Sequence, residues 1–141
     1  MPGMAALVQV ISEQEDMHGE RQTYRSTHRG EVDETANMRT LRYTEEDEAG
    51  GRCDVQLTAA GGIVRLSRRG ESASQLFLAP GERHSSLYET PYGTMELDVQ
   101  THEASWAAQG NSSCILLRYD VYLQGELLSK NRITVTYRVK R

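Results

Sequence analysis

The sequence has few of the residues that mark disulfide-rich, membrane-spanning or helical proteins. It contains two cysteines, three prolines, one phenylalanine and one tryptophan. No apolar run approaches the roughly 18 residues that a membrane span needs, and helical periodicity is almost absent. Cys53 and Cys114 lie within expected strands, and the N-terminus has no basic and apolar signal region. These features predict reduced thiols in a cytoplasmic protein with no membrane partner.

The charge balance excludes another class. A formal net charge of -4 over 141 residues argues against nucleic-acid binding, since nucleic-acid-binding domains usually present a basic face. Arg138, Lys140 and Arg141 form a local basic exception, which we interpret as a solvated strand end. The length fits a single domain, residues 1–141, that is long enough to bury a sizeable core.

Short runs rich in valine, isoleucine, threonine and tyrosine, separated by glycine-containing turns, predict an all-β fold. Such a meander closes into a barrel or a sandwich because an open sheet would leave exposed edges. We expect about ten strands, in chain order: Ala5–Glu13, Arg21–Asp33, Met38–Glu46, Arg52–Ala59, Gly62–Arg69, Ala73–Ala79, Arg83–Thr90, Tyr92–Ser105, Ser113–Gln124 and Leu127–Arg138.

The clearest local signal is the run from Tyr88 to Leu97, which indicates a strand, a tight turn and a second strand. Pro91 fixes its own φ and favours an extended residue before it, and Gly93 gives the turn its freedom. After the turn Met95, Leu97 and Val99 alternate with polar residues, so we expect these three side chains to face inward.

The last two strands carry a change of parity. A two-residue turn at Gln124-Gly125 places Leu128 beside Val121, but the apolar set downstream begins at Ile133 on the other parity. We therefore predict a β-bulge at Ser129-Lys130-Asn131 or a longer turn. In the preceding hairpin, the outward faces predict a cross-strand pair between Asp98 and Arg118.

Two segments in the last third of the chain, Tyr88 to Leu97 and Leu117 to Leu127, closely resemble the bacterial YwiB-like family of uncharacterised proteins. The segments Leu41 to Glu46 and Arg65 to Glu71 match the same family more loosely. The resemblance implies a single antiparallel up-and-down β-barrel of the calycin or lipocalin type, with about 8–10 strands. It implies no activity and supplies no catalytic or binding residues. The stretch from Gln14 to Thr27 departs from the family in its charge and histidine content, which leaves the register of the first hairpin open.

Catalytic and metal chemistry find little support in the sequence. His18, His28, His84 and His102 do not stand at metal-ligand spacing, so we predict no metal and no cofactor. We interpret the acidic run from Glu45 to Glu48 as a solvated loop. No nucleophile elbow is present, and we predict no catalytic residue.

The aromatic residues are the remaining candidates for function. Inward tyrosines would line a small-molecule cavity or simply fill the core, because barrels of this size do both. Tyr88, Glu89 and Tyr92, beside the Pro91 turn, lack a complete structural explanation, and we take them as candidate ligand-binding residues.

Three functional hypotheses follow. The first is a non-enzymatic barrel that binds a small apolar or amphipathic ligand, and a filled barrel without a cavity near ~300 Å³ would argue against it. The second is a protein-interaction module or homodimer that uses an outer face carrying Leu116, Arg118 and Tyr122. The third, an enzyme of unknown class, rests only on scattered acids, histidines and tyrosines.

Overall fold

In the computed structural model, which describes residues 3–46 and 49–140, ten strands form one closed antiparallel barrel. Each strand pairs with its neighbours in the sequence, and the first pairs with the last, so the expected all-β, up-and-down barrel is confirmed. The strands are β1 (Met4–Asp16), β2 (Arg21–Glu34), β3 (Arg39–Glu46), β4 (Arg52–Ala60), β5 (Ile63–Arg69), β6 (Ala73–Leu78), β7 (Arg83–Thr90), β8 (Gly93–Gln109), β9 (Ser112–Leu123) and β10 (Glu126–Val139).

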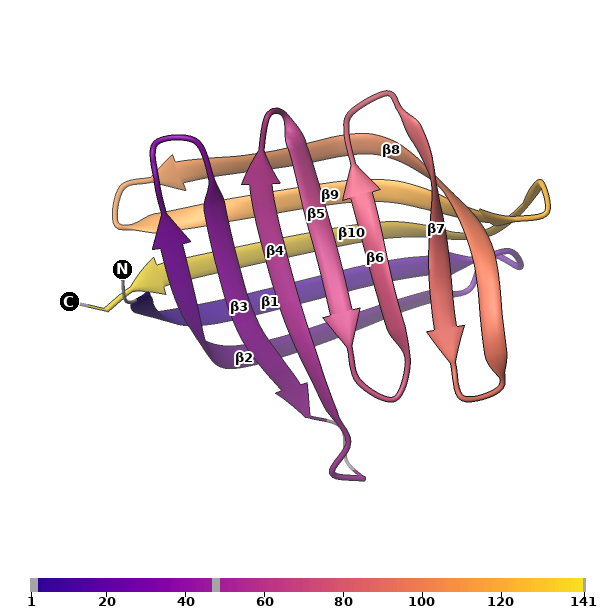
Figure 1. The fold of residues 1–141 in the computed structure, drawn as a ribbon, viewed down its shortest axis with the longest axis horizontal. Coiled ribbons are helices and arrows are strands. Elements are labelled where there is room, and N and C mark those ends of the chain that lie inside the picture. The colour runs from indigo at the N-terminus through magenta and orange to yellow at the C-terminus, as the bar shows by residue number, and fades with distance from the viewer. Residues whose placement is uncertain (1–2, 47–48, 141) are drawn as a thin grey trace.

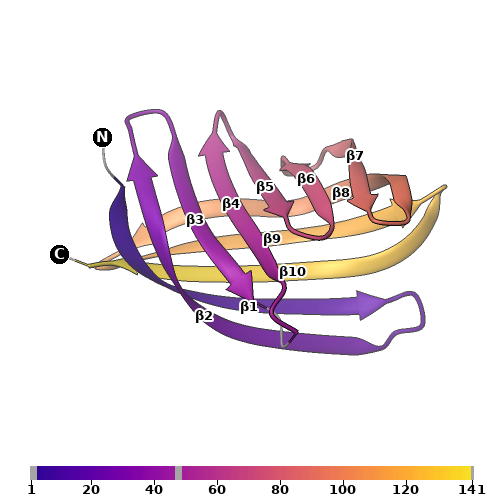
Figure 2. The same ribbon diagram turned by 60° about the horizontal axis from the view of Figure 1, so that its bottom comes forward.

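The barrel is flattened into two layers whose strands cross (Figures 1 and 2). Strands β1, β2, β9, β10 and most of β8 form one layer, and β3–β7 run across it in the other. Strand β2 bends from the first layer toward the second, and only its last part, Gly30 to Glu34, pairs with β3. Strands β6 and β7 also share few pairs, Ala73 with Glu89 and Ser74 with Tyr88. The barrel is therefore closed but loosely joined at these two places.

Alternating apolar side chains fill most of the barrel interior, as the period-two patterns predict. Every strand except β7 contributes to one buried apolar cluster, and β7 contributes the buried Ser86. The largest fully buried members are Tyr137, Leu41, Leu57, Leu78, Ile115 and Leu117.

The predicted bulge in β10 is present, but it lies one residue earlier than expected. The register shifts between Leu127 and Ser129, and Ser129 rather than Leu128 pairs with Val121. Gln124 and Gly125 both adopt positive φ, which fits the two-residue turn that the sequence predicted. The extra residue is Leu128, which follows the turn after two residue pairs and restores the inward parity of Ile133.

The expected cross-strand pair between Asp98 and Arg118 was wrong. Arg118 forms an ion pair with Glu103 at 3.5 Å, while Asp98 pairs with Tyr122 across the strands and accepts a hydrogen bond from Ser85. Strand β8 continues to Gln109, which pairs with Ser112, rather than ending at Ser105, so the register of the hairpin places Tyr122 and not Arg118 across from Asp98. A bulge at His102, which the sequence gave no signal for, then shifts the partner of Arg118 by one further residue, to Glu103.

The inward expectation for the start of β8 holds in part. Val99 is buried and Leu97 is half-buried, but Met95 is 42% exposed although it shares their parity. The first hairpin, whose register the sequence left open, is regular from Met4↔Val32 to Glu15↔Arg21.

Gly30 marks the bend where β2 begins to pair with β3. A Cβ added there would lie 2.8 Å from the carbonyl oxygen of Arg42 and 2.8 Å from Val8 Cγ2. We expect Gly30→Ala to lower the free energy of unfolding by about 1–3 kcal/mol, because the backbone of β3 must move. Ser26→Ala on the exposed part of the same strand is the control, with an expected change within about 0.5 kcal/mol in urea unfolding. Equal stability of the two variants would contradict this explanation of the glycine.

Candidate functional site

The lower end of the β3–β7 layer holds a mouth where polar side chains point into the barrel. A pocket of about 340 Å³ opens there, lined by inward residues near the ends of the strands and by the loops between them. Its lining includes Glu45, Cys53, Arg68, Ser74 and Tyr88. We call this pocket the mouth pocket. It is distinct from the packed interior, which is apolar.

An arginine that faces the inside of the barrel is the main feature of the mouth pocket. Arg68 follows the buried Val64 and Leu66 at period two, so the strand directs its guanidinium inward. Its Nη1 donates a hydrogen bond to Glu45 Oε2 at 3.2 Å, and the two side chains are about equally shielded, 31% and 30% exposed. A guanidinium has five N–H donors, and among the described residues only this one hydrogen bond to Arg68 is recorded.

Two buried tyrosines lie close enough to Arg68 to affect its charge. Burial opposes the cation, but Glu45, Tyr43 and Tyr119 together raise the pKa of Arg68, so it stays charged. Burial also raises the pKa of Tyr43 and Tyr119, with Arg68 acting in the opposite direction. Both phenols are therefore protonated at neutral pH, and each can donate a hydrogen bond.

A continuous row of inward side chains leads away from this cation. The pairs Arg68↔Ser74, Ser74↔Tyr88 and Tyr88↔Met95 join β5, β6, β7 and β8 at one level of the barrel. Neighbouring side chains in such a row lie about 5 Å apart. The row changes from a charged residue through a hydroxyl and a phenol ring to the exposed thioether of Met95.

The three residues taken from the sequence as candidates do not come together. Tyr88 lines the mouth pocket, but Glu89 is exposed on the opposite face of β7, and Tyr92 is 98% exposed at the turn. The turn is held by Thr90, whose Oγ1 donates to the carbonyl of Gly93 and accepts from the Tyr92 amide. The proposal of a site at these three residues stays a prediction, and the geometry offers only Tyr88 a place in a pocket.

Sequence reasoning missed Arg68 and Glu45. The acidic run was interpreted as a solvated loop, yet Glu45 still belongs to β3 and turns toward Arg68, while Asp47 and Glu48 lie outside the described residues. A signal was available: a charged residue at an inward position of an alternating strand, as in Val64-x-Leu66-x-Arg68, is costly unless it is paired or used.

The opposite end of the barrel is tied by side chains. Arg39 Nη1 donates to the carbonyl of Trp106, Trp106 Nε1 donates to the hydroxyl of Tyr137, and that hydroxyl donates to Glu34 Oε1. A surface hollow of about 410 Å³ lies beside this chain of bonds. These bonds join β2, β3, β8 and β10 at this end of the barrel.

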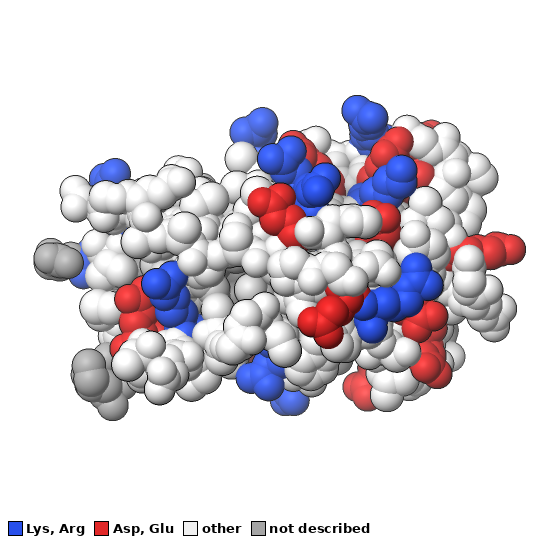
Figure 3. Space-filling model, turned by 90° about the horizontal axis from the view of Figure 1, so that it is seen from above, with Lys and Arg blue, Asp and Glu red and all other residues white. Residues whose placement is uncertain are grey.

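The face seen in Figure 3 carries mixed charges, and the described residues hold no cluster of metal ligands. In the face seen in Figure 3, Lys and Arg lie among Asp and Glu and form no patch of one sign. No group of three or more His, Cys, Asp or Glu side chains in the described part of the chain is placed to hold a metal ion. Within residues 3–46 and 49–140, no helix is long and apolar enough to cross a membrane.

The predicted interaction face is less apolar than the sequence indicated. Leu116 and Tyr122 are half-buried, and the guanidinium of Arg83 stacks over the Tyr122 ring at 4.5 Å. Arg118 is paired with Glu103. A homodimer through this face stays a prediction, as does the cytoplasmic location.

Comparisons with known proteins agree with the fold. The model of a domain of unknown function, DUF1934, matches residues 8–135. A crystal structure of the ywiB protein from Bacillus subtilis is similar at a TM-score of 0.83 and 20% sequence identity, covering 98% of this chain and 93% of that one. A search among curated proteins found no match. At this identity the likeness to the solved structure concerns the fold alone, whereas the family model spans nearly the whole barrel, and the chain belongs to the DUF1934 family of YwiB-like β-barrels.

Proposed function

We propose that this barrel binds a small amphipathic carboxylate at its mouth pocket, with the anionic group on Arg68 and the apolar part toward Met95. The observation that carries the proposal is the inward row Arg68–Ser74–Tyr88–Met95. The row changes from cationic at Arg68 to apolar at Met95. An amphipathic carboxylate changes from anionic to apolar along its length, so the two are complementary. This proposal takes the place of the hypothesis of a ligand bound deep in the barrel, because apolar side chains occupy that space.

The chemistry at the charged end suits a carboxylate. Arg68 is partly shielded from water, permanently charged, and uses one of its N–H groups on Glu45. Bidentate binding of a carboxylate by arginine gives both affinity and orientation. Tyr43 and Tyr119 are protonated and lie near the same charge behind the pocket lining.

The pocket volume also suits a small ligand. About 340 Å³ lies at the lower end of the range for small-molecule sites. A short alkyl chain could lie along Tyr88 and the exposed side of Met95. Burying this surface would contribute about 25 cal/mol for each Å² of apolar area removed from water.

A calorimetric titration with octanoate tests the proposal, and octanol serves as the uncharged control ligand. We expect saturable binding of octanoate and much weaker binding of octanol. In the Glu45→Gln/Arg68→Met double variant, which removes the Glu45 carboxylate together with the arginine that pairs with it, we expect octanoate affinity to fall about 10- to 100-fold.

Arg69→Met is the matched control variant. Arg69 is the next residue of β5, is exposed and points to the opposite face, so its replacement should leave octanoate affinity unchanged. If octanoate bound the double variant as strongly as the wild-type protein, Arg68 would not be part of the binding site. No saturable binding by the wild-type protein would overturn the proposed function.

A further inference from the structure

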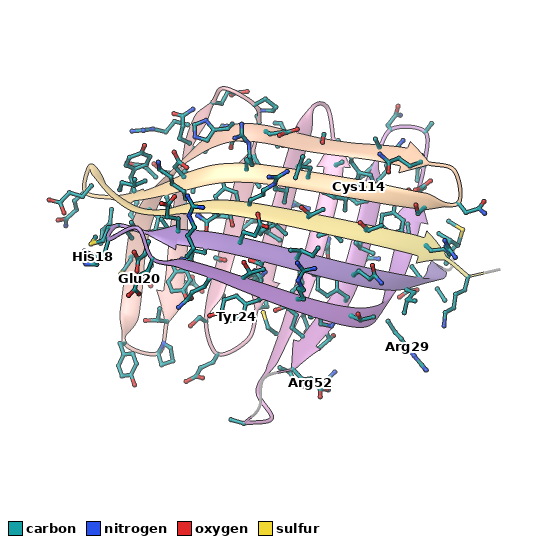
Figure 4. All side chains as sticks on the ribbon, turned by 180° about the vertical axis from the view of Figure 1, so that it is seen from behind. His18, Glu20, Tyr24, Arg29, Arg52 and Cys114 are labelled. Atoms are coloured by element: carbon teal, nitrogen blue, oxygen red, sulfur yellow. The ribbon has the colours of Figure 1, made fainter. Side chains whose placement is uncertain are left out.

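The first nine residues of β2 form a strand with one unpaired edge. Strand β2 pairs with β1 over its length, but its pairing with β3 begins only at Gly30. Residues 21–27 are all exposed. In Figure 4, β2 is the lower border of the nearer layer, and Tyr24 and Arg29 project from it. We call residues 21–29 the free edge.

The hydrogen bonds at the two ends of β2 show which backbone groups face away from β1. Asp16 N donates to the carbonyl of Glu20, so Glu20 faces β1, and Thr35 N donates to the carbonyl of Met38 on the β3 side. Antiparallel pairing alternates between these two directions. The residues that present their N–H and C=O groups at the free edge are therefore Arg21, Thr23, Arg25, Thr27 and Arg29. An extended chain could pair with all five.

The same residues carry a row of positive charge. Their side chains share the outward parity, opposite to the buried Val32, and the three arginines alternate with two threonines. Arg25 stands across from Ile11 and Arg29 across from Leu7 on β1, and within the described residues neither arginine has a recorded ion pair or hydrogen bond. Arg21 lies 3.8 Å from Glu15 and is 81% exposed.

Positive charge continues past the end of the free edge. Arg29 lines a concavity of about 870 Å³ on the outer face of β2–β6, together with Arg42, Arg65 and Arg69. Arg42 is paired with Asp33 at 2.6 Å, and no ion pair is recorded for Arg65 or Arg69 within the described part of the chain. The acids in this concavity are Glu31 and Asp54, fewer than the arginines.

A second copy of this chain would bring the arginines of two free edges together along one seam. In antiparallel two-fold pairing of two free edges centred on Arg25, that residue would stand opposite its own copy, and Arg21 would stand opposite Arg29. Like charges directly opposite each other destabilise strand pairing. The occupant that complements the edge is an extended chain with acidic side chains.

We propose that an extended acidic peptide segment of another protein adds to β2 as a further strand along residues 21–29. Its backbone would pair with the five outward residues, and its glutamates or aspartates at alternate positions would lie beside the arginines. This mode of recognition takes affinity from backbone hydrogen bonds and specificity from alternate side chains. The proposal does not depend on a ligand in the mouth pocket, because it uses the edge and the outer face of β2.

The probe is a peptide of alternating glutamate and threonine as long as the free edge. Amide hydrogen exchange of the protein, followed residue by residue by NMR, should show slower exchange at Thr23, Arg25 and Thr27 when the peptide is bound. The amides of Gln22, Tyr24 and Ser26, which face β1, should change little. Fluorescence anisotropy of labelled peptide gives the affinity, which should fall as salt is raised.

Charge reversal provides the matched variants. We expect Arg25→Glu to weaken peptide binding by about tenfold or more, whereas Arg132→Glu, an exposed position on the central strand β10, should have little effect. Thr23→Pro removes one N–H from the free edge without breaking a bond to β1, and it should also weaken binding.

Three outcomes would overturn the proposal. One is exchange protection at the even residues as much as at the odd ones, which would indicate general stabilisation. Another is equal affinity for a peptide of the same composition with its glutamates in one block and its threonines in the other. The third is self-association of the peptide-free protein through residues 21–29, seen by sedimentation and abolished by Thr23→Pro.

Discussion

Replacement of Leu117 by alanine is expected to lower the free energy of unfolding by about 2–5 kcal/mol. Leu117 is fully buried on β9, in the layer opposite β3–β7, and belongs to the apolar cluster at the centre of the barrel. The truncation removes apolar area and also leaves a cavity, because strands paired on both sides cannot collapse into it. Urea unfolding followed by far-ultraviolet circular dichroism measures the change.

Leu87→Ala is the control for this prediction. Leu87 is 57% exposed on the outer face of β7, so its truncation should change stability by less than about 0.5 kcal/mol. If the two variants were equally stable, the interior would be a hollow that tolerates truncation. That result would also reopen the possibility of an apolar ligand deep in the barrel.

The strands could be predicted from the sequence because each carries its own alternation. Strand β7 has the predicted bounds, Arg83–Thr90, and the final hairpin has the predicted turn at Gln124-Gly125. These are local properties: the period of the side chains and the few residues that accept positive φ. The family resemblance added the closure of the barrel, which joins β1 to β10 and is a long-range contact.

Bulges were harder to predict. A change in the alternation of inward and outward side chains shows that an extra residue is present in a strand, but it does not show where that residue lies. The change of parity before Ile133 required one extra residue, which the structure puts at Leu128, two residue pairs after the turn. The bulge at His102 left no such trace. The cross-strand partner of Arg118 was wrongly assigned mainly because β8 extends to Gln109, beyond its expected end at Ser105, which moves the register of the hairpin.

The candidate site could be predicted only in part because it depends on which strands converge. Tyr88 was identified beside its turn, but its neighbours in the pocket come from β3, β4, β5 and β6. Glu45 looked like one member of an acidic run, and only the fold turns it toward Arg68 while directing Glu46 outward. Residues far apart in the sequence form one site only when the pairing registers of the strands bring them to the same level of the barrel. Every hairpin between those residues contributes to these registers.

The buried tyrosines predict a steep loss of stability in alkali. Burial raises the pKa of Tyr43 and Tyr119 above 10.0, and burial likewise raises that of Tyr137. Below about pH 10 these groups are protonated in both the folded and the unfolded chain, and they add no pH dependence. Above it the unfolded chain loses protons that the folded chain keeps, so stability falls by up to about 1.4 kcal/mol per pH unit for each such tyrosine.

Alkaline titration with two simultaneous readouts tests this expectation. Tyrosinate absorbance follows ionisation of the phenols, and the buried phenols should ionise only together with the loss of β-structure in circular dichroism. The Tyr43→Phe/Tyr119→Phe double variant should shift the unfolding midpoint to higher pH, relative to its own stability at pH 8, while Tyr92→Phe should not. Ionisation of all tyrosines before any loss of structure would mean that water reaches Tyr43 and Tyr119 in the folded barrel. In that case Arg68 would lie in a wet opening, where a carboxylate competes with water and Glu45 and gains much less from its charge.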